Sequence, residues 1–212
     1  YQGTEANATG WKTSSTTGAF NSALQDNMYV GYMYTSGQLH GNGTNSTIKG
    51  VLDSWYNSNL NNYASYIATG GGAAFCNDRT LSSGTGTGTT KTYYAASNRL
   101  HTNKAPTFKC ADTRDRFATS VGLITADEVA YGGGVYGISN SSYYLYTDQV
   151  YWIMSPFSYD YDCAIVFDVN PNGSLDGSSL NGNFGVRPVI NLKSDVSFSS
   201  GNGTSSNPYT VS

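Results

Sequence analysis

Aliphatic residues are scarce in this chain, and the scarcity limits the kind of core it can build. Leu, Ile, Val and Phe account for 38 of the 212 residues, a share below the roughly 20% under which chains are usually disordered. Disordered chains, however, also combine few aromatic residues with a high net charge. This sequence contains 18 Tyr and 3 Trp, and its net charge is only −3. We therefore expect a folded chain in which Tyr and Trp supply much of the buried area.

Charge and hydropathy exclude several classes of partner. The 11 Lys and Arg residues are spread singly along the chain, which gives no phosphate-binding surface and argues against nucleic acid. No run approaches the 18 or so apolar residues that cross a membrane, so we expect no membrane insertion by this segment. The chain begins Tyr-Gln-Gly-Thr without a signal peptide. Few charges with abundant Thr, Asn, Gly and Tyr indicate an extracellular or cell-surface bacterial protein whose anchoring segment is absent from this chain.

Three cysteines bear on the compartment. Cys76 and Cys110 each follow an aromatic-containing stretch and lie 34 residues apart, and we expect a disulfide between them, consistent with an exported protein. Cys163 lies in a different kind of segment and is left over. The alternative is a reduced chain with three buried thiols.

The pattern of apolar residues predicts one α+β domain over residues 1–212. After an irregular lead-in (1–25), a helix begins behind Ser46 and carries apolar residues at helical spacing from Ile48 to Leu60. Thr125 and Glu128 form a capping-box pattern that predicts a second helix, Ala126 to Tyr131. Strands are expected at 28–34, 121–124, 143–146, 151–154, 164–169 and 185–192, and a flexible loop at 82–90.

Several segments in the last third of the chain resemble segments of a known group of proteins. The segments Tyr151–Pro156, Ala164–Phe167, Gly185–Asp195 and Gly201–Tyr209 look like the C-terminal domain of exported and pilin-like proteins of Gram-positive gut bacteria. Three earlier segments fit the same group, so that the resemblance covers roughly residues 45 to 209: Phe75–Arg79, Pro106–Cys110 and Val121–Val129.

The arrangement of Trp152 before Gly185-Val-Arg-Pro-Val also resembles the variable proteins of diversity-generating retroelements, which have a C-type-lectin-like fold. This resemblance implies two helices, a small mixed or antiparallel sheet with long loops, and a hypervariable ligand-binding region at 150–192. In such proteins a fixed scaffold displays side chains that differ from copy to copy.

The residues themselves agree with a division into a fixed scaffold and ligand-binding loops. Trp152, Phe167 and Val186 occupy apolar strand positions, and Arg187 can serve as a structural cation bound to carbonyl groups or to a carboxylate. The intervening stretches 157–162 and 168–183 are rich in Tyr, Ser, Asn, Asp and Gly, which binding loops favour. Turns favour the same residues, so plain solvated loops are the alternative. The predicted ligand-binding residues, with Tyr159 and Tyr161 expected to face solvent, are Phe157, Tyr159, Asp160, Tyr161, Asp162, Asp168, Asn170, Asn172, Asp176, Asn181 and Asn183.

Metal binding and catalysis have weaker support. Residues 168–176 imitate the start of a calcium loop, but Ser179 stands where the bidentate Glu belongs, and we expect an Asx-turn-rich hairpin instead. His40 and His101 lie in polar loop sequence and are expected to be surface residues. Asp127 and Glu128 are explained as first-turn acids, although sequence spacing leaves a two-carboxylate glycosidase open. We expect no cofactor, no bound metal and no enzyme activity.

Two functions follow as expectations. The first is an extracellular ligand-binding domain for display or adhesion, diversified by a retroelement, whose partner is a protein or glycan on another cell, a phage or a host surface. The second is a structural pilin-like or surface-layer subunit whose partners are other pilus subunits.

Overall fold

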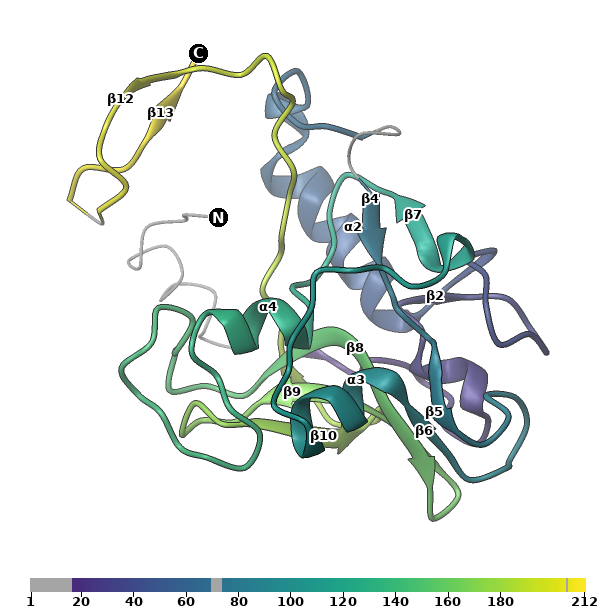
Figure 1. Ribbon diagram of the computed structural model, residues 1–212. Helices are drawn as coiled ribbons and strands as arrows, with labels where there is room; N and C mark the ends of the chain where they lie inside the picture. Colours follow the sequence, from purple (N-terminus) through teal and green to yellow (C-terminus); the bar gives the residue numbers. More distant parts are fainter. Residues whose placement is uncertain (1–16, 70–73, 205) are drawn as a thin grey trace.

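A long antiparallel hairpin organises the computed structural model, which describes residues 17–69, 74–204 and 206–212. Its strands are β8 (Tyr151–Asp160) and β9 (Cys163–Val169), and β10 (Leu175–Ser179) pairs with β9 on the far side. Figure 1 shows these strands at the base of the molecule. They belong to a seven-stranded sheet whose remaining members are β1 (Thr17–Gly18), β5 (Leu81–Ser83), β6 (Thr92–Tyr94) and β11 (Phe184–Gly185). Every pairing in it is antiparallel except that of β11 with β8.

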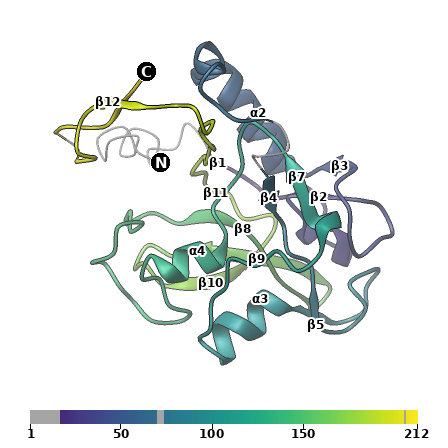
Figure 2. The same cartoon turned by 45° about the horizontal axis from the view of Figure 1, so that its top comes forward.

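The described residues also form three two-stranded sheets outside the large one. They are β2 (Met33–Tyr34) with β3 (Thr44–Asn45), β4 (Ala74–Cys76) with β7 (Arg116–Ala118), and β12 (Phe198–Ser200) with β13 (Thr210–Val211). The β12–β13 hairpin stands apart from the large sheet at the end of an extended stretch (Figures 1 and 2). The fold class is therefore α+β with mostly antiparallel strands, as the sequence predicts.

The described part of the chain contains three α-helical segments, α2 (Thr47–Asn59), α3 (Ala95–Ser97) and α4 (Ala126–Tyr131). α3 continues into a π-helical turn, η3 (Asn98–Thr102). Three 3-10 turns complete the set: η1 (Asn27–Val30), η2 (Asn61–Tyr63) and η4 (Thr113–Asp115). The two predicted helices are confirmed, whereas the α3 segment was not predicted.

Helix caps form where the sequence places them. The Ser46 side chain accepts a hydrogen bond from the Lys49 backbone N–H and begins α2. Thr125 and Glu128 make both bonds of the capping box, which fixes the start of α4. Both caps satisfy backbone donors that a helix N-terminus leaves without an intrahelical partner.

Several predicted strands are wrong. Residues 28–30 form part of η1 because the Asp26 side chain accepts the Met28 N–H and starts a turn. The 143–146 stretch is a turn closed by the Tyr146 N–H on the Tyr143 carbonyl. Gly122 and Val189 form only an isolated bridge between the predicted strands 121–124 and 185–192. Conversely, β10 lies inside a stretch expected to be loop, and of the lead-in only residues 17–25 lie within the described part.

The two faces of the β8–β9 hairpin bury two separate apolar clusters. One contains Trp152, Met154 and Val166 together with Ile48 and Leu52 of α2. The other cluster lies under α3 and α4 and contains Ile153, Phe167, Val169, Ala96 and Val129. Aromatic rings fill much of both clusters, as the composition predicts.

The predicted exposure of Tyr159 is wrong. Its side chain is 1% exposed and belongs to the same cluster as Trp152. The register of β8 against β9 shifts between Trp152 and Pro156 and again between Pro156 and Ser158. Such irregularities break the alternation of side chains along a strand, so Phe157 and Tyr159 pack in different clusters although they are two residues apart.

Replacing Tyr159 with Ala should lower the free energy of unfolding by about 3–5 kcal/mol, because it leaves a cavity in the core. Replacing it with Phe should leave stability unchanged or raise it by about 1 kcal/mol, since the buried Tyr159 hydroxyl has no hydrogen-bond partner within the described residues. Urea denaturation of both variants measures the difference. A Tyr159→Ala protein as stable as wild type would contradict the buried position.

Candidate functional site

The predicted ligand-binding residues are divided between two ends of the β8–β9–β10 strands. Asp160, Tyr161 and Asp162 form the turn between β8 and β9. Asn170 and Asn172 belong to the turn between β9 and β10, at the opposite end. The seven residues of β9 separate the two turns by about 20 Å. The structure therefore presents two small surfaces instead of one continuous face.

The β8–β9 turn is tight and has an unusual backbone. Asp160 pairs with Cys163, and the two residues between them, Tyr161 and Asp162, have φ angles of 51° and 59°. Two-residue turns with both φ angles positive match the twist of a hairpin, but they usually contain Asn, Asp or Gly. A tyrosine in this conformation is strained by roughly 1 kcal/mol or more, and 91% of its surface is exposed.

An ion pair and two rings support this turn. Lys91 Nζ lies 2.6 Å from Asp160 Oδ2, and the Tyr93 hydroxyl donates to the same oxygen at 2.9 Å. The Lys91 ammonium is also 5.5 Å from the Tyr93 ring centroid and 5.7 Å from that of Tyr161. The hydrogen bond from Lys91 lowers the pKa of Asp160, and the same bond raises the pKa of Lys91. We call Lys91, Tyr93, Asp160, Tyr161 and Asp162 the hairpin tip.

The β9–β10 turn is an Asx-turn hairpin, as the sequence predicts. Asn172 Oδ1 accepts the Ser174 N–H, and Asn170 Nδ2 donates to Asp176 Oδ2 at 3.0 Å. The Asn172 amide in turn donates to the Ser139 hydroxyl. Within the described residues, no group of three or more His, Cys, Asp or Glu side chains could hold a metal ion.

The other predicted contact residues occupy different environments. Asp168 is completely buried, which corrects its prediction as a contact residue. Phe157 is half-buried, with its ring 5.7 Å from that of Tyr136 and 4.9 Å from that of Phe167.

Asn181 and Asn183 are exposed after β10. Asn181 Oδ1 accepts a hydrogen bond from the Ser179 hydroxyl, whose oxygen lies 2.8 Å from the Cys163 sulfur. Asn181 therefore lies near the hairpin tip.

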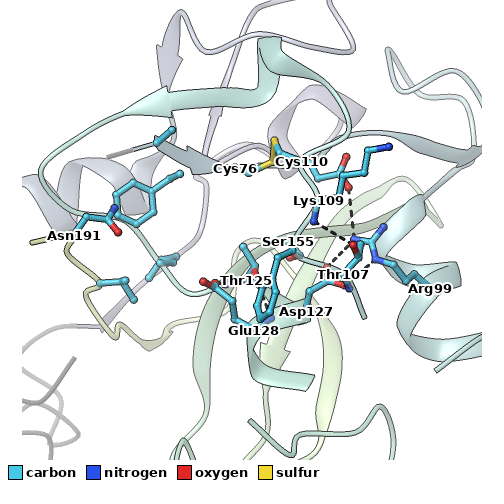
Figure 3. Close-up of a pocket in the computed structure, with 16 residues that line it drawn as sticks. Cys76, Arg99, Thr107, Lys109, Cys110, Thr125, Asp127, Glu128, Ser155 and Asn191 are labelled. Carbon is cyan, nitrogen blue, oxygen red and sulfur yellow. Dashed lines mark hydrogen bonds and ion pairs between the residues drawn. A yellow bond between two sulfur atoms is a disulfide. The ribbon is translucent and has the colours of Figure 1, made fainter. Parts of the chain in front are cut away.

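A cavity of about 220 Å³ lies beside the Cys76–Cys110 disulfide, on another part of the molecule. The disulfide, predicted from sequence, joins β4 to the irregular stretch 105–112, with its Cα atoms 5.8 Å apart. Figure 3 shows Arg99 and Asp127 on one side of the opening and Asn191 on the other. Exposed Phe108 also lines the cavity, and its ring stacks on that of Tyr131 at 4.3 Å.

Asp127 connects three segments at the wall of this cavity. Arg99 donates to its two oxygens at 2.8 and 2.7 Å, and the Thr107 backbone N–H donates to it at 2.8 Å. Arg99 also lies 3.5 Å from Asp78. The sequence interpretation of Asp127 as a first-turn acid is therefore incomplete. Its carboxylate joins η3 and the 105–112 stretch to α4.

His40 has carboxylates at both ring nitrogens, which the sequence interpretation missed. Its Nδ1 lies 2.9 Å from Asp115 Oδ2 and its Nε2 3.6 Å from Asp112 Oδ2, and its side chain is only 13% exposed. Burial raises the pKa of Asp115, against the effect of hydrogen bonds from the Arg79 backbone and His40. Arg114 holds the pKa of Asp112 well below its usual range. Because these residues come from distant segments, no local pattern signals the cluster. His101 is exposed, as expected.

Comparisons with known proteins give no assignment: no protein-family model, no curated protein and no solved structure matches the chain. Among the helices of the described ranges, none is long and apolar enough to cross a membrane.

Replacing Asp127 with Asn should lower the free energy of unfolding by about 3 kcal/mol, because it leaves the guanidinium of Arg99 partly buried without its main counter-ion. Amide exchange at Thr107 should also accelerate. Chemical denaturation and hydrogen exchange measure the two effects. Glu128→Gln, which keeps an acceptor in the capping box, is the matched control and should change stability by under about 0.5 kcal/mol. An Asp127→Asn protein within that range of wild type would contradict the connecting role.

Proposed function

We propose that this chain is an extracellular ligand-binding domain for display or adhesion, on a C-type-lectin-like scaffold. The observation that carries the proposal is the hairpin tip, where an almost fully exposed tyrosine is fixed in a strained turn beside an ion pair. A rigid aromatic side chain gives contact area with little loss of conformational entropy on binding. Strained backbone conformations persist only where the surrounding structure holds them, and they concentrate at active sites and ligand-binding sites.

The disulfide supports an oxidising, extracellular compartment. The proposed partner is a protein or a glycan on another cell, a phage or a host surface, contacted by Tyr161, Asp162 and Asn181. Diversification by a retroelement belongs to this proposal. A second, adenine-biased copy of the coding sequence for residues 150–192 beside a reverse transcriptase gene would support it.

Tyr161→Asn should reduce binding at least about tenfold without lowering the melting temperature, because it removes the exposed ring and Asn tolerates positive φ. Binding can be measured on a printed glycan array and on immobilised mucin, collagen and fibrinogen. Tyr63→Asn is the matched control, since Tyr63 is 56% exposed but lies in η2, outside the hairpin tip. Equal binding by wild type and Tyr161→Asn to a surface that wild type recognises would exclude the hairpin tip as the contact.

A structural pilin-like or surface-layer subunit is the second candidate. The β12–β13 hairpin favours it, because Phe198 and Tyr209 are 60% and 50% exposed and their rings lie 4.8 Å apart. An isolated two-stranded hairpin is marginally stable in water, so contact with other subunits would stabilise it. Concentration-dependent assembly, followed by light scattering and lost in a Phe198→Ser/Tyr209→Ser variant, would favour this function. A monomer at all concentrations would exclude it.

A further inference from the structure

Asp168 is a carboxylic acid buried within the sheet. Its side chain lies in β9 with none of its surface exposed, and neither carboxylate oxygen makes a well-formed hydrogen bond within the described residues. Burying an ionised carboxylate without a paired cation is very unfavourable, and such a group takes up a proton instead.

The groups around Asp168 disfavour its charge. Asp176 of β10 is its direct partner in the antiparallel register, so both side chains lie on the same face of the hairpin. Trp152, its partner on β8, contributes no charge. Tyr136 remains a neutral phenol, because burial and then the charges of Asp176 and Asp168 raise its pKa. Only the Ser178 hydroxyl favours the ionised carboxylate. On Tyr136 lie His101, with ring centroids 4.3 Å apart, and Lys104, 5.9 Å from the ring, and neither contributes to the pKa shift of Asp168. No cation compensates Asp168 among these groups.

Burial is the largest cause that raises the pKa of Asp168, to about 7, and the charge of Asp176 adds to it. In an opened or unfolded hairpin the group returns to its ordinary pKa of 3.8. The folded form therefore binds more protons between these two values, and stability must fall as the pH rises from about 4 to about 7. Above about pH 7 the protonated carboxyl no longer contributes to the stability of the hairpin.

Other segments depend on the same hairpin. The Leu175 N–H donates to the Val135 carbonyl, and the Leu175 carbonyl accepts the Gly137 N–H. The Asn140 N–H donates to the carbonyl of Asn172 in the turn. Opening β10 away from β9 would therefore release the stretch 135–140 and also the turn that holds Asn170 and Asn172.

We propose that Asp168 makes the β9–β10 hairpin pH-sensitive: the hairpin stays closed while this carboxylic acid carries its proton and opens more often once the proton is lost to solvent. This pH-dependent opening affects the β9–β10 turn and the adjoining 135–140 stretch. It does not involve the ion pair at the hairpin tip, so it stands independently of the proposed ligand contact.

Two measurements on the wild-type protein test this proposal. The ¹³C chemical shift of the Asp168 carboxyl carbon should titrate with a midpoint near neutral pH. The protection factors of the Leu175 and Asn170 amides, already corrected for intrinsic exchange, should fall on the order of 100-fold between pH 5 and pH 8. A midpoint below about pH 5, or protection that does not change with pH, would overturn the proposal even if no variant folds.

Variants identify the group responsible. In Asp168→Asn the protection factors should vary by less than about threefold over the same range, because the titrating group is absent. In Asp176→Asn the Asp168 midpoint should move to lower pH, since the facing charge is removed. Asp162→Asn, which removes an exposed carboxylate at the other end of β9, is the matched control, and its protection factors should fall with pH as they do in wild type. A fall that persists unchanged in Asp168→Asn would assign the effect to another group and overturn the proposal.

Discussion

The antiparallel pairing of β8 with β9 is the interaction on which the rest of the structure depends. Both faces of this hairpin are buried, one with Trp152 and Met154 and the other with Ile153 and Phe167. A chain with few aliphatic residues gains two cores from one pair of strands in this way. The Trp152 ring stacks on Phe184 at 4.3 Å, so aromatic contacts supply packing that Leu and Ile provide in most domains.

Buried cations hold the irregular segments to this framework. The guanidinium of the completely buried Arg79 donates to the Asn27 carbonyl, while the Arg79 backbone N–H donates to Asp115. Arg99 binds Asp127 through two hydrogen bonds. Arg187, predicted to be a structural cation, is buried, donates to the Leu145 carbonyl and lies 4.8 Å from the Tyr151 ring. Loops with few apolar side chains cannot dock by hydrophobic burial alone. Removing Asp127 would leave the charge of Arg99 buried without its main counter-ion. Hydrogen bonds from these buried guanidinium groups therefore fix the paths of the loops.

Features encoded locally could be predicted from the sequence, and those that depend on distant partners could not. Ser46, Thr125 and Glu128 act on backbone groups within three residues, and both helix starts were predicted correctly. β10 reads Leu-Asp-Gly-Ser-Ser, which has no strand propensity, and it forms because β9 provides a partner. The position of Tyr159 depends on an irregular register that no alternation pattern reveals. Of the candidate site, the residues within the two turns were predicted. Lys91 and Tyr93 of the hairpin tip were not, and neither was the separation of the two turns.

Packing also limits where a hypervariable surface can lie. Tyr159 and Asp168 lie inside the predicted variable region 150–192, yet both are buried, so changes there would act on the fold before they act on a ligand. Tyr161 and Asn181 are exposed, and the Tyr161 backbone requires only a residue that tolerates positive φ. Asn, Asp and Gly meet that requirement best, and a tyrosine meets it at a cost in stability. The ligand contact that we propose would give a reason for a tyrosine at this position, which the turn itself does not supply.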